Sequence, residues 1–533
     1  MRVFEVIVFQ GTGRFKTRVV EPILRTIGAP AAAGLAFFRR SFTPDPAAPP
    51  ERNFSISRDL FLRGLGLLLL AAFVSAGLQL PGLIGSKGVL PLAESLKAVA
   101  VDYGPRRFFL LPTLFWFHAG DLFLTGACWL GAACSLLLAL GILPLPCLLA
   151  AWALYLSIVV GGAEFFDFQW DFLLLEMAFL ALFLAPPLRL SPSRRKNLPP
   201  AMRWLLLWLL FRVVFFSGVV KLVGADPSWG SLNALRYFFQ SQPLPTPPGW
   251  WAQKLPDPVL SGLCLVVLVI ELGIPFFMLF GRRLRLASFA ILAAFQAALL
   301  VFANTNFLNH AVLLLLLMLV DDAAWRKSLL LRPLTNRYPE RPLPGRTHWV
   351  LVPYFLFIAI VSIVQTAADL GHRGPWPSSL LSLYRFNVPM RLTGHYGYTL
   401  TSLDYRPQIV LEGTLDGREW KEYSFRWAPG DPKRMPGFSS PHSPRLEARL
   451  WLASYSRCED VPWFQQFTGR LAMASPAVLS LLAKDPFNGQ APLTVRSMRY
   501  GYRFSDFPEW RRTGEWWVRF ERGEFCPPVS KPD

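Results

Sequence analysis

Long apolar runs separated by short polar loops fill the middle of the chain. Most of these runs are roughly 17 to 24 residues long, which is enough to cross a hydrocarbon core about 30 Å thick as a helix. The nine runs lie near residues 60–80, 121–142, 145–162, 168–186, 202–223, 258–280, 284–303, 307–321 and 349–367. The pattern predicts an α-helical polytopic membrane protein with about nine transmembrane helices spread over residues 58–367.

After residue 368 the pattern changes to the alternation that is typical of strands. Two alternating runs flank Asp416-Gly417, a dipeptide that favours a tight hairpin turn, and a third covers 493–504. Apolar spacing over 444–454 and 472–483 predicts helices between the strands. We expect a β-rich domain within 368–533.

Composition excludes several classes of protein. Apolar residues form 53% of the 533 residues and charged residues only 17%, whereas soluble domains carry about a quarter charged residues. The same apolar content excludes a disordered scaffold. Residues 1–57 are only weakly apolar and are expected to form an N-terminal cytoplasmic extension and linker. Neither a metal site nor a cofactor site is predicted, because the six cysteines form no Cys/His cluster with zinc-site spacing.

The net charge of +19 would suggest binding to nucleic acid, but the positions of the basic residues indicate otherwise. Most basic residues near the apolar runs lie in four regions on one predicted side of the membrane, namely 52–63, 189–203, 282–285 and 326–346. Basic loops stay in the cytoplasm, so the charge indicates topology, and the bilayer rather than nucleic acid is the expected partner. The N-terminus is then cytoplasmic and the C-terminal domain is exported. That side is the periplasm for a bacterial inner membrane and the lumen for an endoplasmic reticulum membrane.

Several charged or polar residues occur inside the apolar runs, where each needs a partner or a function. Glu176 and Arg212 each lie ten residues from the inner end of their helices, about 15 Å deep, and are expected to form an ion pair. Lys221 lies nearer the outer face, level with Asp171 and Asp167. Further polar groups of this kind are Glu271 and His310.

For several of these groups the sequence leaves two interpretations open. Lys221 is either a structural ion-pair partner or, because desolvation lowers the pKa of an amine, a base near neutral pH. His310 is either a polar residue whose ring nitrogens are hydrogen-bonded for structural reasons or a proton shuttle. Cys458 and Cys526, the only cysteines beyond the apolar runs, could pair in an oxidising compartment. The aromatic loops 107–118 and 229–251 either lie at the membrane interface or receive a partner protein.

Several motifs then resemble one known family in their order along the chain. They are Leu80–Pro91, Pro112–Asp121, Ser217–Leu222, Asp226–Trp229, Gln242–Pro247, Arg385-Phe-Asn-Val-Pro, Thr393–Gly397, Pro429–Asp431 and Pro441–Arg445. Together they resemble the lipase maturation factor family over roughly residues 55–525.

That resemblance implies a membrane-bound folding or assembly factor for secreted or envelope proteins, lipases among them, rather than an enzyme. The exported domain and the outer loops 81–120 and 225–256 would face the client protein. The client-facing candidates are Trp116, His118, Trp229 and His395.

A second resemblance leads to a different hypothesis. Gly218-Val-Val-Lys221, followed by Trp229, is similar to the catalytic-lysine context of vitamin K-dependent carboxylases. It implies a membrane enzyme that uses Lys221 with Asp171 or Asp167 on a lipid-soluble substrate. A transporter is a third hypothesis, but the apolar helices show no matched breaks at glycine or proline in two halves of the chain.

Overall fold

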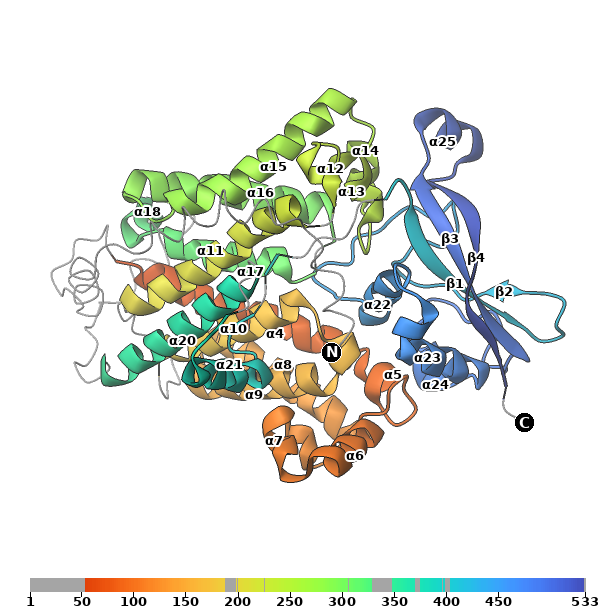
Figure 1. Cartoon of the computed structure of the whole chain (residues 1–533), viewed down its shortest axis with the longest axis horizontal. Coiled ribbons are helices and arrows are strands. Elements are labelled where there is room, and N and C mark those ends of the chain that lie inside the picture. The colour runs from red at the N-terminus through yellow and green to blue at the C-terminus, as the bar shows by residue number, and fades with distance from the viewer. Residues whose placement is uncertain are drawn as a thin grey trace.

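Each of the nine apolar runs contains a helix in a computed structural model of the protein (Figure 1). The structure describes residues 53–186, 198, 200–224, 226–304, 306–327, 348–369, 374–394, 396–397 and 403–531. The helices are α4 (Ser55–Gly77), α8 (Asp121–Leu140), α9 (Pro144–Gly161), α10 (Gln169–Leu182), α11 (Pro200–Val223), α15 (Asp257–Phe277), α16 (Arg282–Phe302), α17 (Leu308–Leu316) and α20 (His348–Asp369). The expected extension over 1–57 lies outside the described residues as far as residue 52.

Six of these helices are long and apolar enough to cross a membrane: α4, α8, α9, α11, α15 and α16. The other three are shorter in their apolar parts. With 14 and 9 residues, α10 and α17 rise only about 21 Å and 14 Å, and the apolar part of α20 is 352–367. The chain is therefore a helical membrane protein, while helix length alone does not establish nine crossings.

Small residues let the first two long helices approach closely. A Cβ on Gly66 of α4 would lie 2.6 Å from the backbone nitrogen of Ala139 in α8, and one on Gly131 would meet the ring of Phe73. Close backbone contact of this kind is how helices associate in lipid. Gly126, the other glycine of α8 that could pack in this way, has no atom within 4 Å of an added Cβ.

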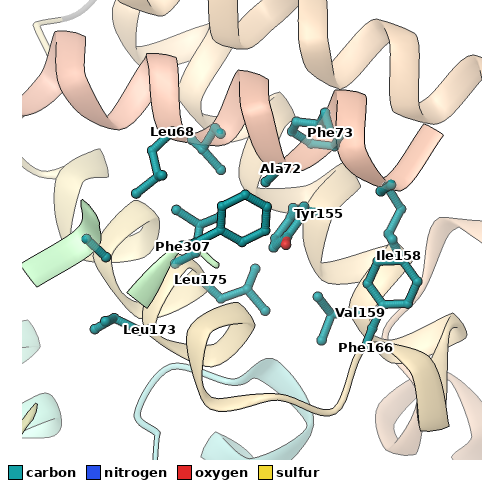
Figure 2. Packing of buried hydrophobic residues seen from close by; sticks show 14 of the residues in the cluster. Leu68, Ala72, Phe73, Tyr155, Ile158, Val159, Phe166, Leu173, Leu175 and Phe307 are labelled. Carbon is teal, nitrogen blue, oxygen red and sulfur yellow. The ribbon is translucent and has the colours of Figure 1, made fainter. Parts of the chain in front are cut away.

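The core of the bundle gathers side chains from α4, α9 and α10 and from the start of α17 (Figure 2). Phe73 and Tyr155 meet edge to face with ring centroids 5.3 Å apart. Phe307, fully buried, fills the space beside them. Packing of this density fixes how each helix is rotated, and that rotation decides which polar groups meet.

Short helices connect the long ones at the end of the bundle that faces the C-terminal domain (Figure 1). They are α5 (Leu80–Ile84), α6 (Leu92–Tyr103), α7 (Arg107–Leu110), α12 (Pro227–Gly230), α13 (Leu235–Ser241) and α14 (Pro247–Ala252). The opposite end carries α18 (Asp322–Lys327). There Asp321 binds Arg282 and Arg285, which joins the start of α16 to the chain after α17.

The C-terminal domain contains a four-stranded antiparallel sheet in the order β2-β1-β3-β4. The strands are β1 (Arg406–Thr414), β2 (Lys421–Glu422), β3 (Thr494–Phe504) and β4 (Trp517–Ser530). Four helices accompany them: α22 (Arg445–Ala453), α23 (Pro462–Ala472), α24 (Pro476–Leu479) and α25 (Phe507–Thr513). All of β1 is buried, because α22 covers one face of it and the short helices α12 and α13 cover the other.

Most of the expected elements of this domain are confirmed. The turn at Asp416-Gly417, the strand over 493–504 and the helix over 444–454 are present, but of the alternating run 420–427 after the turn only Lys421–Glu422 forms a strand. The helix expected over 472–483 is wrong: α23 ends at Ala472, and only α24 lies beyond it.

One helix after residue 368 packs against the bundle rather than the sheet. α21 (Ser378–Met390) folds back along α20, where the Tyr384 hydroxyl donates to Gln365 Oε1 over 2.6 Å and the rings of Phe386 and Phe357 lie 6.3 Å apart. The later residue of α21 contacts the earlier residue of α20, so the two helices run antiparallel. The chain therefore turns back into the bundle before it enters the sheet.

Candidate functional site

Lys221 binds a carboxylate of a neighbouring helix at the end of α11. Its Nζ donates to both carboxylate oxygens of Glu271 in α15, over 2.6 Å and 2.7 Å, and to the Ser217 carbonyl over 3.2 Å. The ring of Trp229 covers the ammonium, with its centroid 5.1 Å from Nζ. The lysine is thus held on three sides and only partly exposed.

Lys221 binds Glu271 rather than Asp171 or Asp167, the two carboxylates that the sequence places level with it. Both Asp171 oxygens bind the fully buried guanidinium of Arg445, and Asp171 also accepts from the Tyr155 hydroxyl over 2.6 Å. Asp167 lies 3.6 Å from Arg391. Depth along a helix can be counted from the sequence, but the direction of a side chain around the helix axis cannot, and here α15 lies against α11.

Arg212 and Glu176 form an ion pair inside the bundle, the two residues that the depth count brought together. The structure adds two partners that the sequence did not reveal. Glu176 Oε2 accepts from the Gly394 amide over 2.9 Å and from the Tyr396 hydroxyl over 2.7 Å. The segment after α21 therefore ends on a buried carboxylate of α10.

A row of polar residues joins the C-terminal domain to the end of the bundle that faces it. In α4, Ser75 Oγ lies 3.0 Å from His442 Nδ1, and just beyond that helix Gln79 donates to the Ser443 carbonyl and accepts from the Arg445 amide. Between α16 and α17, Asn304 bonds Gly437 and Ser439, and the Asn306 carbonyl accepts from Ser440 Oγ. His310 Nδ1 lies 3.1 Å from the Asn306 carbonyl and so contacts backbone of the same segment.

The end of α13 and the loop between α13 and α14 make a second junction, with the sheet. Arg406 at the start of β1 donates to the carbonyls of Gln242 and Pro243. Gln240 bonds the Asp404 carbonyl and the Phe504 amide. Burial lowers the pKa of Arg406 to about 10, which still leaves the guanidinium charged at neutral pH.

Comparison with known proteins gives matches over both the helical bundle and the C-terminal domain. Residues 56–327 match the family model described as lipase maturation factor transmembrane domain, and residues 392–527 match the lipase maturation factor C-terminal domain. Lipase maturation factor 2 of Homo sapiens is 32% identical over 90% of this chain and 83% of its own length. Lipase maturation factor 1 of Homo sapiens is 30% identical over 96% of this chain and 97% of its own length. Lipase maturation factor 1 of Bos taurus is 30% identical over 92% of this chain and 94% of its own length.

The chain belongs to the lipase maturation factor family. No solved structure matches it.

The two regions that match lipase maturation factor models meet at buried polar contacts. Asp171, Glu176 and Gln79 belong to the first region, and Arg445, Gly394 and Tyr396 belong to the second. The motifs Thr393–Gly397 and Pro441–Arg445 are thus the parts of the second region that reach into the first. Their sequence resemblance carried no information about these contacts.

The four residues predicted to face a client protein have different positions. His118 is exposed beside Phe117, while Trp116 is half-buried and donates its Nε1 to the Leu111 carbonyl over 2.8 Å. Trp229 is only 3% exposed, so its role as a client-facing residue is wrong: it packs over Lys221 instead. His395 lies outside the described residues.

A disulfide joins Cys458, just before α23, to Cys526 of β4. It ties the helical face of the C-terminal domain to the outer strand of the sheet. In the part of the chain that the structure describes, no group of three or more His, Cys, Asp or Glu residues could hold a metal ion.

Proposed function

We propose that this protein is a membrane-bound maturation factor that helps secreted or envelope proteins, lipases among them, to fold or assemble. The observation that carries the proposal is family membership over both the bundle and the C-terminal domain. Relatives that align over nearly their whole length are named lipase maturation factors.

The proposal includes a topology with nine crossings, a cytoplasmic N-terminus and an exported C-terminal domain. Contacts between helix ends support the alternation. Asp322 accepts from the backbone and hydroxyl of Ser55 at one end of the bundle, where Asp321 also binds Arg282. Arg285 and Arg326 add positive charge at this end, as expected for a cytoplasmic face. The protein would sit in the inner membrane of a bacterium or the endoplasmic reticulum membrane of a eukaryote.

The domain division that we propose follows from the packing of α21. The residues before α4 form the cytoplasmic extension, 55–397 form the membrane part including the segment that turns back, and the exported domain begins near 403. The expected boundary at 368 would have split α21 from the helix on which it packs. A reporter fused after Asp533 tests the topology: activity of an export-dependent reporter is expected, and a cytoplasmic signal contradicts nine crossings.

A client would meet an apolar surface on the outer loops. Phe117 is 84% exposed, and Phe108, whose ring lies 5.7 Å from that of Trp116, is 53% exposed. His118, next to Phe117 in the chain, is also exposed. Exposed aromatic clusters of this kind on an otherwise folded protein mark interaction sites. The C-terminal domain lies at the same end of the bundle, so both could contact one client (Figure 1).

The enzyme hypothesis has no geometric support. Lys221 is bound to Glu271, and Asp171 is bound to Arg445 and Tyr155, so the three groups do not form one reactive cluster. The structure therefore favours structural roles for these charges.

The experiment that tests the function compares a secreted lipase from the same organism with and without this protein. When the protein is absent, we expect the mass of exported lipase to stay unchanged and the lipase activity per unit mass to fall. Re-expression of the wild type should restore that activity, whereas a Phe117→Ser/His118→Ala variant present at wild-type level should restore less. Unchanged activity per mass would contradict a role in maturing that lipase.

A further inference from the structure

Two aromatic side chains are exposed side by side where the bundle meets the sheet. Trp251 of α14 is 52% exposed and Phe507 of α25 is 37% exposed, with ring centroids 5.4 Å apart. Beneath them, Trp250 is fully buried and contacts Phe507, Trp510 and Trp516 at 5.4, 5.9 and 5.1 Å. The exposed pair thus rests on a rigid platform built from both parts of the protein.

The position of this pair relative to the membrane follows from α15. This helix is long enough to cross the bilayer and begins at Asp257, six residues after Trp251. Apolar exposure continues from the pair along the chain: Leu255, Val259 and Val266 are 40%, 45% and 49% exposed. Since 21 helical residues rise about 31 Å, the start of α15 lies near the boundary between hydrocarbon and water.

Basic side chains accompany the exposed rings. Arg511 and Arg512 in the last turn of α25 are both exposed, while Arg503 is held by Glu509. Aromatic rings favour the headgroup level of a bilayer, and neighbouring arginines bind the phosphates of anionic lipids. Both features occur together on a helix that belongs to the C-terminal domain.

We propose that Trp251, Phe507, Arg511 and Arg512 form a lipid-contact site through which the C-terminal domain rests on the bilayer. The two rings lie at the boundary of headgroups and acyl chains, and the two arginines bind the phosphates of anionic phospholipids. Lipid is the occupant because the exposed pair continues directly into the apolar face of α15, which already faces lipid.

Spin labelling of the full-length protein in nanodiscs tests this site. A nitroxide on Phe507→Cys, or on Trp251→Cys if the first variant folds poorly, reports its accessibility to oxygen and to a polar nickel chelate. The matched control is Leu415→Cys, which is also exposed (43%) but lies in the turn between β1 and β2, far from the bundle (Figure 1). Background signal from the unsubstituted protein is subtracted.

We expect the ratio of oxygen to nickel accessibility to be several-fold higher at 507 than at 415. Replacing part of the phosphatidylcholine with phosphatidylglycerol should raise the ratio at 507 further, and Arg511→Glu/Arg512→Glu should remove that increase. Equal ratios at 507 and 415 would overturn the proposal. So would a ratio at 507 that rises only when a purified secreted lipase is added, because the surface would then belong to a client protein.

Discussion

Arg445 joins two parts of the chain that are 274 residues apart. Its guanidinium and the carboxylate of Asp171 are both fully buried, and Tyr155 donates to the same carboxylate. Leaving a buried charge without its partner lowers the free energy of unfolding by far more than the intact pair contributes to it. At the scale of single residues, therefore, the stability of the fold depends on buried ion pairs. Each member of such a pair is needed because its removal would leave the other charge buried without a partner.

Arg445→Met is expected to lower the free energy of unfolding by about 3 to 5 kcal/mol, because Asp171 stays buried without a counter-charge. Adding Asp171→Asn should recover much of the loss, since an amide still accepts from Tyr155. Thermal unfolding in detergent measures both effects, with the exposed Arg426→Met as the control. Equal destabilisation by Arg445→Met and Arg426→Met would show that the pair is unimportant.

Glu447 of α22 makes stability depend on pH. Burial raises the pKa of Glu447 from 4.5 to about 7, although its carboxylate accepts from the amides of Trp427 and Ala428. Because the folded state binds the proton more tightly than the unfolded state, stability is highest below pH 4.5 for this group and decreases as the pH rises to about 7. The total effect is on the order of 3 kcal/mol.

Glu447→Gln is therefore expected to remove this decrease, so that the variant gains stability relative to the wild type as the pH rises from 5 to 8. Melting temperatures of the two proteins at a series of pH values measure the difference. Glu459→Gln, which changes an exposed carboxyl, should follow the wild type at every pH. A constant difference between Glu447→Gln and wild type would argue against titration of Glu447.

At the scale of elements, each of the nine apolar runs predicted from hydropathy contains a helix, whereas the strand β4 was not predicted. The length and apolar content of a run are local properties of the sequence, so a helix can be predicted from them without knowing which elements pack against it. In contrast, β4 contains Gly523 with φ +106° and the pair Pro527-Pro528, and its pairing with β3 shifts register three times. These irregularities interrupt the alternation by which a strand is identified.

The segment after α21 approaches the backbone of α11 closely at Gly397, where there is no room for a side chain. At Gly397 φ is +100°, and a Cβ there would lie 2.4 Å from the Phe216 carbonyl oxygen. Gly397→Ala should therefore destabilise the protein by about 2 kcal/mol or more. Melting temperature in detergent measures this, with Gly126→Ala, where an added Cβ meets no atom, as the harmless control. A neutral Gly397→Ala would mean that the segment is not packed as described.

At the scale of the whole molecule, the bundle and the C-terminal domain share buried polar contacts. Glu176 takes two hydrogen bonds from Gly394 and Tyr396, and Asp171 takes its counter-charge from Arg445. In the described residues, Asp171 of the bundle therefore takes its counter-charge from the later part of the chain, and Glu176, which also pairs with Arg212 of α11, takes two further hydrogen bonds from it.

Removing residues 391–533 should consequently destabilise the bundle as well as delete the C-terminal domain. We expect a lower melting temperature and a lower level of the truncated protein in membranes than for the full chain. Asp171→Asn introduced into the truncated chain should raise both, because it removes the unpaired buried charge. A truncated bundle as stable as the full protein would show that the two parts are independent.

The sequence by itself determined where the apolar helices lie, which end of the bundle is basic, and which motifs identify the family. These features depend on local composition and order, so no neighbour is needed to recognise them. Only the tertiary structure decided that Lys221 binds Glu271, that Trp229 is buried, and that the chain turns back to Glu176. Those outcomes depend on how each helix is rotated and which helix it meets, and packing against the rest of the molecule sets both.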